Sequence, residues 1–308
     1  MLLLSGISLL LAYVSLKYVE KPFRQKEKVS SKNIARLSVI GIAVFVALGI
    51  GGHLSEGYEN RLTEQQQQLI AWKSYPRQSY YLEGTCFLGP FQTFEEFEEQ
   101  CIQSGLSLIW GDSFAAALAS GWRTLEQDVS QLTASSCPPI LEQSFSERKN
   151  CRSINDFAFK TIIANHNKVI YLHANWQEYN ESSIKKLKHT LAELKANGIK
   201  DIVILGGVPH YYPSLPDVLF KENVTLEGEH YSRDDSIDVR KADALLEKIA
   251  LESGVRFESM LDHFCDNGRC ISVIKKDNRY VPTAWDMGHL TKEGSEFVSQ
   301  KVLSTIRK

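Results

Sequence analysis

The chain has 308 residues, of which 43% are hydrophobic and 23% charged, and this composition is typical of folded globular proteins rather than of disordered or collagen-like chains. Its 35 Lys and Arg nearly balance its 37 Asp and Glu, for a formal net charge of -2. Residues 1–54 hold seven of the basic and two of the acidic residues, which leaves 28 basic and 35 acidic residues after them. This acidic surplus argues against binding nucleic acid through its phosphates.

Two apolar stretches open the chain, from Met1 to Val19 and from Ile34 to Leu54. Each is close to the roughly 20 residues with which a helix crosses a bilayer. The segment that joins them concentrates positive charge at Lys17, Lys21, Arg24, Lys26, Lys28, Lys32 and Arg36. Because positive charge favours the cytoplasmic side of short membrane loops, we predict two transmembrane helices, a cytoplasmic connector and an exported remainder after Leu54.

Each apolar stretch has an alternative interpretation: a cleaved signal peptide for the first and a buried core helix for the second. A signal peptide carries its positive charge before its apolar run. Here Met1 to Leu16 contains no charge, and the basic residues follow. The order of charged and apolar residues therefore favours membrane-spanning helices.

All six cysteines lie in the exported part, as three pairs of sequence neighbours: Cys86 and Cys101, Cys137 and Cys151, and Cys265 and Cys270. An even number of cysteines in an exported domain indicates disulfides, and pairing between neighbours is the simplest of several connectivities. Zinc binding is the alternative, favoured locally by His263 near Cys265 and Cys270, but no C-x-x-C pair is present. We therefore predict disulfides and no metal site.

The polar stretch from Ser55 to Tyr81 is interpreted either as a stalk or as an extension that packs on the following domain. After Cys86, short apolar runs suit buried strands at Leu106–Trp110, Val169–His173, Ile202–Leu205 and, more weakly, Val255–Glu258. Helical stretches alternate with these strands. That alternation predicts an α/β fold with a parallel sheet sandwiched by helices, in which ligands collect at the carboxyl ends of the strands.

Two of the helices have clear sequence signals. Apolar residues recur at spacings of three and four within Ser182–Ala196, and Asn197-Gly198 closes that helix as a left-handed cap does. The last helix is predicted to begin at a Thr291 cap and to lay an apolar side on the sheet.

The first strand leads directly into Gly111-Asp112-Ser113 and then into an alanine-rich helix start. A serine at such a turn stands at the carboxyl end of the strand, where its own N–H and the helix N-terminus face any negative charge that develops. We therefore interpret Ser113 as a candidate nucleophile. The alternative is an ordinary turn in which Asp112 or Ser113 caps the helix.

A serine nucleophile needs a base. His289 alone among the eight histidines has an aspartate three residues earlier, Asp286, and the pair lies just before the last helix. In a turn, Asp286 could accept from one imidazole nitrogen while the other faces Ser113. The alternative is a solvated loop histidine beside an acid at a helix start.

These motifs together resemble a known superfamily. Gly111-Asp112-Ser113, Asn175 within His-Ala-Asn-Trp, and Asp286-x-x-His289 resemble the SGNH (GDSL-like) hydrolases. The segment Tyr18–Arg24, which reads Tyr-Val-Glu-Lys-Pro-Phe-Arg, resembles the end of the acyltransferase family 3 membrane domain. Some members of that family carry a fused periplasmic SGNH domain, and Cys137-Pro138-Pro139 resembles those members.

The resemblance implies a division of the chain into four parts. Residues 1–24 would be the last helix of an acyltransferase-3-like membrane domain, and 25–54 a cytoplasmic loop with an additional transmembrane helix. Residues 55–81 would be a periplasmic linker or extension. Residues 82–308 would be an SGNH-hydrolase-like (flavodoxin-like) catalytic domain.

The resemblance also implies an activity: O-acylation, usually O-acetylation, of a surface polysaccharide at the periplasmic side of a bacterial inner membrane. Ser113 would be the nucleophile, His289 the general base and acid, and Asp286 the residue that orients His289. Asn175, unless it is only a strand-end turn residue, would donate its side-chain amide to the oxyanion beside the Ser113 N–H. No cofactor would be bound by this chain, because the membrane domain would supply an acyl group derived from acetyl-CoA.

Three features depart from the superfamily pattern. No glycine between Gly121 and Gly198 can supply the usual oxyanion-hole N–H, so we expect a backbone donor near Ser136, or a hole weaker by about 3–4 kcal/mol per missing donor. Position 114 is Phe where fused members often have His, and we expect its ring to pack or to line the cleft. Most of the membrane acyltransferase domain lies outside this sequence, so we expect it elsewhere in a longer chain or in a separate partner.

Two alternative functions remain open. An SGNH carbohydrate esterase would form the same acyl-serine and differ only in that water attacks it. A non-catalytic, membrane-anchored glycan-binding module is the second alternative. Aromatic residues that could stack on sugar rings are Trp110, Trp176, Tyr211, Tyr212 and Trp285, although we expect at least half of them to complete the core or its loops.

Overall fold

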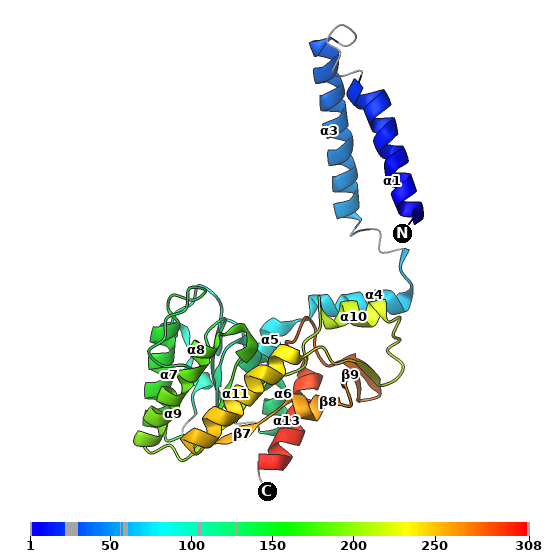
Figure 1. Cartoon of the computed structure of the whole chain (residues 1–308). Coiled ribbons are helices and arrows are strands. Elements are labelled where there is room, and N and C mark those ends of the chain that lie inside the picture. Colours follow the sequence, from blue (N-terminus) through cyan, green and yellow to red (C-terminus); the bar gives the residue numbers. More distant parts are fainter. Residues whose placement is uncertain are drawn as a thin grey trace. The chain divides into compact units, whose positions relative to one another are not determined.

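The structure is a computed structural model that describes residues 2–21, 30–55, 57, 61–103, 106–126 and 129–306. The chain divides into two compact units, Met1–Thr63 and Glu64–Lys308 (Figure 1). The polar stretch that follows Leu54 is thus shared between the two units. From Glu64 onward it belongs to the second unit and contributes to its core.

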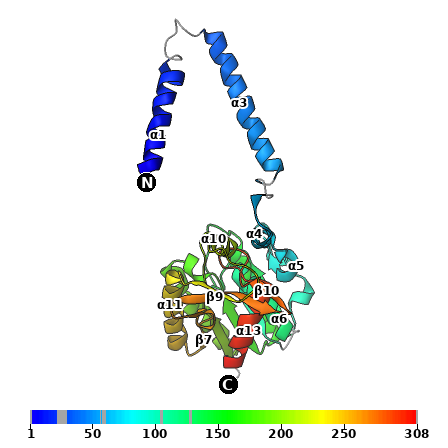
Figure 2. The same cartoon turned by 90° about the vertical axis from the view of Figure 1, so that its right-hand side faces the viewer.

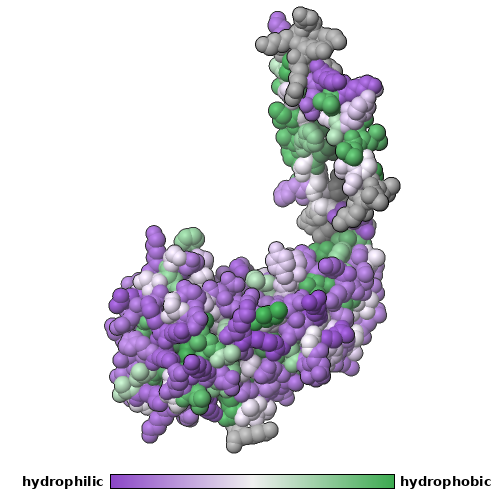
Figure 3. All heavy atoms as spheres, viewed as in Figure 1, coloured by the Kyte–Doolittle hydropathy of each residue, from purple (hydrophilic) through white to green (hydrophobic). Residues whose placement is uncertain are grey.

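The first unit contains helix α1 (Leu2–Ser15), a π-helical continuation η1 (Leu16–Glu20) and helix α3 (Ser31–Leu54). Among the described residues, one helical segment, Lys32–Leu54, is long and apolar enough to cross a membrane. Large apolar side chains stand exposed along these helices, and Figure 3 shows them as hydrophobic surface. Removing such surface from water is favourable, which suits a lipid environment.

The structure supports one of the two predicted membrane-spanning helices. The second is supported by its length and composition. The first is not, because α1 ends after 14 residues and its π-helical continuation carries the charged residues Lys17 and Glu20. The end of the motif in this region, Pro22-Phe23-Arg24, lies outside the described residues.

The second unit is built on a six-stranded parallel sheet with the order β1-β3-β2-β4-β5-β7. Its strands are β1 (Phe87–Leu88), β2 (Leu108–Gly111), β3 (Ser130–Ala134), β4 (Val169–His173), β5 (Asp201–Leu205) and β7 (Arg256–Glu258). From β2 the chain passes first to β3 on one side and then to β4 on the other. Such a reversal leaves a crevice at the carboxyl ends of the strands, where ligands bind in sheets of this kind.

Helices cover both faces of the parallel sheet, as Figures 1 and 2 show. The main helices are α6 (Ser113–Leu125), α7 (Cys151–Asn165), α8 (Glu181–Lys185), α9 (Leu187–Ala196), α10 (Leu215–Lys221), α11 (Ile237–Ser253) and α13 (Lys292–Ile306). The remaining helical segments are α4 (Glu64–Ala71), η3 (Trp72–Ser74), α5 (Arg77–Tyr81), η4 (Phe94–Glu96), η5 (Glu99–Cys101), η6 (Trp176–Glu178) and α12 (Leu261–Phe264).

The strands alternate their side chains between two cores. Ile109 of β2 packs in one core with residues of α6 and α13. Its neighbours Leu108 and Trp110 pack in the other core with residues of α7, α9 and α11. Because successive side chains of a strand point to opposite faces, continuous apolar runs are what a sheet buried on both faces requires.

A second, antiparallel sheet is not predicted by the sequence patterns above. It comprises β6 (His230–Arg233), β8 (Cys265–Asp266), β9 (Arg269–Lys276) and β10 (Arg279–Pro282). β9 and β10 form a hairpin whose turn residues, Asp277 and Asn278, have φ values of 45° and 60°. An Asp-Asn turn between two short strands is a hairpin signal, but the many charged residues of these strands obscure the alternation.

The predicted strands are confirmed as β2, β4, β5 and β7. β3 is missed because its sequence, Ser-Gln-Leu-Thr-Ala, is mostly polar although all five residues are buried. The fold accommodates them by hydrogen bonds, since Gln131 donates to the Tyr81 carbonyl and Thr133 to the Cys86 carbonyl, each over 2.9 Å. The helix predicted at Ser182–Ala196 is two helices, α8 and α9, that meet at Lys186.

The capping and cysteine predictions are confirmed. Thr291 caps α13 by accepting from the Gly294 N–H over 3.0 Å, and Gly198 has the left-handed φ of 88° expected after α9. The three disulfides join sequence neighbours: Cys86 to Cys101, Cys137 to Cys151, and Cys265 to Cys270. Disulfides between these neighbours leave no thiolate for zinc, and His263 bonds instead to Glu258 over 2.6 Å.

Candidate active site

The turn between β2 and α6 places Ser113 at the carboxyl end of the central strand. Gly111 is required there, because a Cβ atom at this position would lie 1.7 Å from the carbonyl oxygen of His173 on β4. Asp112 is the N-cap of α6 and accepts from the Phe114 N–H over 2.8 Å. Ser113 is thus the first residue of the helix, where backbone N–H groups point toward any negative charge.

The loop before α13 brings Asp286 and His289 to the same place. Ser113 Oγ lies 2.8 Å from His289 Nε2, and His289 Nδ1 lies 2.7 Å from Asp286 Oδ2. Burial opposes the charge of Asp286, but hydrogen bonds from the His289 side chain and from the Gly288 and His289 N–H groups lower its pKa. An ionised Asp286 fixes Nδ1 as a donor and leaves Nε2 as the acceptor for the Ser113 hydroxyl.

Asp112 is a further residue of the site whose role beyond capping the sequence patterns did not predict. Its carboxylate, 2% exposed, accepts from the Phe114 N–H, from the Asn175 N–H over 2.9 Å and from the Tyr179 hydroxyl over 2.9 Å. Burial raises the pKa of Asp112, and these hydrogen bonds oppose that shift. Asp112 thus ties the turn that bears Ser113 to the segment that bears Asn175.

Asn175 and Ser136 are the two residues considered above as oxyanion donors beside Ser113. Asn175 follows β4, and both residues line the same cavity as Ser113 and His289. Within the described part of the chain, the backbone N–H groups of Ser113 and Ser136 and the Asn175 side-chain amide have no hydrogen-bond partner. Ser136 has a φ of 52°, a left-handed conformation that favours glycine. Ser136, near which a backbone donor is expected in the absence of the superfamily glycine, thus has a glycine-like conformation and an unpaired N–H.

The Phe114 ring packs against two histidines. Its ring centroid is 4.3 Å from that of His289 and 5.5 Å from that of His210, and its ring is nearly parallel to His210. Phe114 is buried and lines the cavity, so it both packs and lines the cleft. Burial lowers the pKa of His210 to about 4, which leaves this second histidine uncharged at neutral pH.

The cavity around Ser113 and His289 has a volume of about 490 Å³, within the usual range for small-molecule sites. One side is formed by the loop between β3 and α7, which contributes residues 143–147. The carboxylates that line the cavity include those of Glu147 and Glu178. Among the described residues that line it, none is Lys or Arg. The arrangement joins a serine, a base, an orienting acid and unpaired N–H donors in one acidic cleft, which suits acyl transfer.

Of the aromatic residues considered for sugar stacking, Trp110, Trp176 and Tyr211 are buried in the core. Tyr212 is 90% exposed and lines a second cavity of about 270 Å³, which shares Glu178 and Met287 with the first. Trp285 stacks on the ring of His289 at a centroid distance of 5.7 Å. Burial thus favours a packing role for the three buried rings, whereas a stacking role remains open for Tyr212.

Comparison with known proteins places this geometry in context. The periplasmic domain of a lipopolysaccharide acetyltransferase from Salmonella ser. Paratyphi A is 21% identical, with a TM-score of 0.63 over 78% of this chain and 97% of that chain. An acetyl-xylooligosaccharide esterase from Geobacillus is 14% identical, with a TM-score of 0.38 over 67% and 95%. A carbohydrate acetylesterase family member from Sinorhizobium meliloti is 13% identical, with a TM-score of 0.40 over 66% and 97%.

The likeness to the acetyltransferase domain shows that the second unit has the SGNH fold. No curated protein sequence matches the chain. Residues 78–304 match the family described as "SGNH domain (fused to AT3 domains)". Because this match covers well over half of the chain, the protein belongs to the family of SGNH domains that are fused to acyltransferase-3 (AT3) membrane domains.

Proposed function

We propose that the protein is a serine-dependent O-acyltransferase that transfers an acyl group, usually acetyl, to a hydroxyl of a surface polysaccharide. The observation that carries this proposal is the hydrogen-bonded series Ser113, His289 and Asp286 at one end of an SGNH sheet. The family link to AT3 membrane domains favours transfer over hydrolysis, because such a domain would deliver the acyl group to this side of the membrane.

The reaction has two halves. In the first, Ser113 Oγ attacks the acyl carbonyl of the donor while His289 Nε2 takes the serine proton. The resulting oxyanion accepts from the Ser113 N–H, the Asn175 side-chain amide and the Ser136 N–H. The tetrahedral intermediate collapses to an acyl-serine, and His289 returns its proton to the departing group.

In the second half, the acceptor takes the place of the leaving group. His289 Nε2 removes the proton of a sugar hydroxyl, whose oxygen attacks the acyl-serine carbon. The same donors stabilise the second oxyanion. Its collapse breaks the bond to Ser113 Oγ, which recovers the proton from His289, and releases the acylated sugar. Asp286 stays ionised and stabilises the imidazolium that forms in both halves.

The cellular setting is part of the proposal. The apolar helix would anchor the chain in a bacterial inner membrane, with the SGNH domain in the periplasm, where disulfides persist. The three disulfides and the structural likeness to the Salmonella acetyltransferase periplasmic domain support this setting. The AT3 membrane domain, in the same longer chain or in a partner, would supply an acyl group derived from acetyl-CoA, so this chain needs no cofactor of its own.

The charge of the cleft indicates the kind of acceptor. Glu178 faces both cavities, whereas Asp235 and Asp238, which line the second one together with the exposed Tyr212, are paired with Arg233 and Lys241. Among the described lining residues, neither cavity contains Lys or Arg. Anionic sugars would be repelled there, so we propose an acceptor that is uncharged or positively charged near the modified hydroxyl.

A serine-reactive fluorophosphonate tests the proposal on the full chain in detergent. Mass spectrometry should locate the adduct on Ser113, and His289→Ala should abolish labelling, whereas the surface variant His189→Ala should label normally. Wild-type protein should then acetylate neutral oligosaccharides from an activated acetyl ester. Labelling followed only by hydrolysis would indicate an esterase, and absence of labelling in folded protein would indicate a glycan-binding module.

A further inference from the structure

The imidazole of His289 contacts two aromatic rings. The Phe114 ring centroid is 4.3 Å away, and the Trp285 ring is stacked on the imidazole at 5.7 Å with an interplanar angle of 22°. Trp285 is in turn stacked on Tyr75, at 6.2 Å and 13°. Tyr75 belongs to the segment Glu64–Tyr81, which follows the apolar helix in the sequence. The stack therefore connects that segment to the candidate catalytic histidine.

A hydroxyl of the same segment bonds to both flanks of His289. Tyr81 OH accepts from Trp285 Nε1 over 2.8 Å and donates to the Leu290 carbonyl over 2.7 Å. Tyr81 is 1% exposed, so these bonds are shielded from water. Losing a hydrogen bond at such a buried position costs more free energy than losing one at the surface. One buried phenol thus holds a residue before His289 and the residue directly after it.

The end of the loop is held in the same way. The Lys292 N–H donates to Tyr75 OH over 2.6 Å, while Trp285 N–H donates to the His289 carbonyl and closes the turn over 3.1 Å. The loop from Trp285 to Lys292 contains Asp286 and His289. Its two ends are therefore fastened to side chains that come from more than two hundred residues earlier in the chain.

We propose that Tyr81 and Trp285 are positioning residues for His289, and that the segment Glu64–Tyr81 is a functional part of the active site rather than a spacer. This inference rests on the proposed acyl transfer for its effect on rate. Neither residue lines the cavity, so both act through His289: the Trp285 ring restricts rotation of the imidazole, and Tyr81 fixes Trp285 and the backbone of the loop. Loss of alignment by about 1 Å can lower a rate about 100-fold.

The test compares Tyr81→Phe, Trp285→Phe and Trp285→Leu in the full chain in detergent. With a small acetyl ester as donor, Trp285→Leu should lower kcat about 100-fold with little change in KM. Trp285→Phe should recover a large part of the loss, because it restores a ring against His289. Tyr81→Phe should lower kcat about 10-fold. The control Trp122→Phe, which removes a comparable indole N–H bond from α6 to its C-cap residue Glu126, should keep the wild-type kcat.

A spectroscopic measurement separates positioning from general stability and from the proposed function. The Nδ1 proton that His289 donates to Asp286 should give a low-field proton NMR resonance in wild type, which broadens or disappears in Trp285→Leu and Tyr81→Phe but persists in Trp122→Phe. Unchanged kcat and an unchanged resonance in both variants would overturn the inference. If wild type neither labels nor turns over, the proposed function fails, and the resonance alone then decides the positioning role.

Discussion

The carboxylate of Asp112 accepts a hydrogen bond from the backbone N–H of Asn175 over 2.9 Å. The two residues follow β2 and β4, which are neighbours in the sheet. Asp112 also caps α6, which begins with Ser113. A single buried carboxylate therefore ties the turn that bears the nucleophile to the segment that bears one candidate oxyanion donor.

Replacing this carboxylate gives the first prediction. In Asp112→Asn an amide NH2 group must face one of three donors, because the Phe114 N–H, the Asn175 N–H and the Tyr179 hydroxyl all point at it. We expect the free energy of unfolding to fall by about 1–3 kcal/mol and kcat to fall at least about 10-fold as Asn175 shifts. Chemical denaturation and ester turnover measure the two effects.

Tyr179→Phe is the matched control, since it removes one donor and leaves no donor facing a donor. Its kcat should exceed that of Asp112→Asn. Equal activity of Asp112→Asn and wild type would show that the carboxylate only caps the helix.

The side-chain amide of Asn175 gives the second prediction. It lines the cavity and has no hydrogen-bond partner among the described residues, as expected of a donor that waits for an oxyanion. Asn175→Ala should lower kcat about 100- to 1000-fold and leave KM for a small ester nearly unchanged, because the bond forms mainly in the transition state. A change confined to KM, measured by steady-state kinetics, would instead assign Asn175 to ground-state binding.

Ser136 gives the third prediction. A residue with a side chain in the left-handed region costs roughly 1 kcal/mol more than glycine, and Ser136 has a φ of 52°. Ser136→Gly should therefore keep the loop conformation and catalytic activity while raising the thermal midpoint by a few degrees. Thermal unfolding followed by circular dichroism measures the change. A lower midpoint together with lost activity would mean that the serine hydroxyl has a role of its own.

Much of this site could be predicted from sequence because its key residues stand beside strong local signals. Ser113 follows an apolar strand and precedes a run of alanines, and Asp286 and His289 stand just before a capped helix. A parallel sheet brings strand ends to one edge, so such signals meet in space although 176 positions separate Ser113 from His289.

The remaining features depend on contacts that local patterns do not encode. Asp112 looks like a helix cap, and only the fold brings Asn175 and Tyr179 to its second oxygen. Tyr81 lies in a polar stretch, and its bonds to Trp285 and Leu290 join distant parts of the chain. The buried strand β3 can have a polar sequence because Gln131 and Thr133 form hydrogen bonds with distant parts of the chain.

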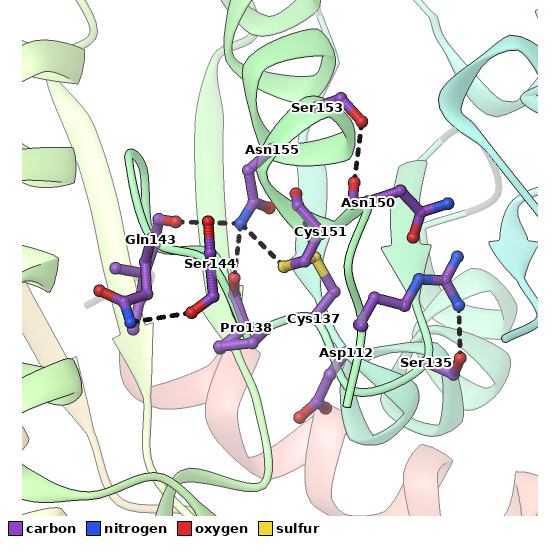
Figure 4. The surroundings of a disulfide bond; sticks show 12 residues. Asp112, Ser135, Cys137, Pro138, Gln143, Ser144, Asn150, Cys151, Ser153 and Asn155 are labelled. Carbon is purple, nitrogen blue, oxygen red and sulfur yellow. Dashed lines mark hydrogen bonds between the residues drawn. A yellow bond between two sulfur atoms is a disulfide. The ribbon is translucent and has the colours of Figure 1, made fainter. Parts of the chain in front are cut away.

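The disulfide Cys137–Cys151 gives the fourth prediction. It closes the loop that lines the cavity at residues 143–147, and Figure 4 shows Asn155 of α7 beside it, donating to the Pro138 carbonyl over 2.8 Å. Cys137→Ser with Cys151→Ser should cost about 3 kcal/mol of stability, as for a loop of this length, and should also raise KM. The pair Cys265 and Cys270, outside the catalytic cavity, serves as the comparison.

Removal of Cys265–Cys270 should cost about 2 kcal/mol, because its loop is shorter, and should leave KM unchanged. The two double variants thus differ in their kinetics more than in their stability. Denaturant unfolding measures the stability of each double variant, and ester kinetics measures its KM. An equal KM in both variants would show that the loop around residues 143–147 is held by its other contacts.

The fifth prediction concerns pH and His173, which is 1% exposed at the end of β4. Burial lowers the pKa of His173 to about 4, against a weaker opposing hydrogen bond with the Leu205 carbonyl. The unfolded chain binds a proton near the ordinary pKa of about 6.5, whereas the folded protein does not bind it until about pH 4. The contribution of uncharged His173 to the free energy of unfolding is therefore fully present above pH 6.5. It is lost as the pH falls toward 4, by up to about 3 kcal/mol.

His173→Leu removes this contribution, and the Leu205 carbonyl keeps its bond from Trp176 Nε1 over 2.9 Å. Asp243 acts in the opposite sense, because burial raises its pKa to about 6, and that contribution is common to both proteins. The difference in unfolding free energy between wild type and His173→Leu, measured by denaturant titration at each pH, should therefore shift in favour of the variant between pH 6.5 and 4. A difference that stays constant over this range would mean that His173 binds its proton equally well in the folded and unfolded states.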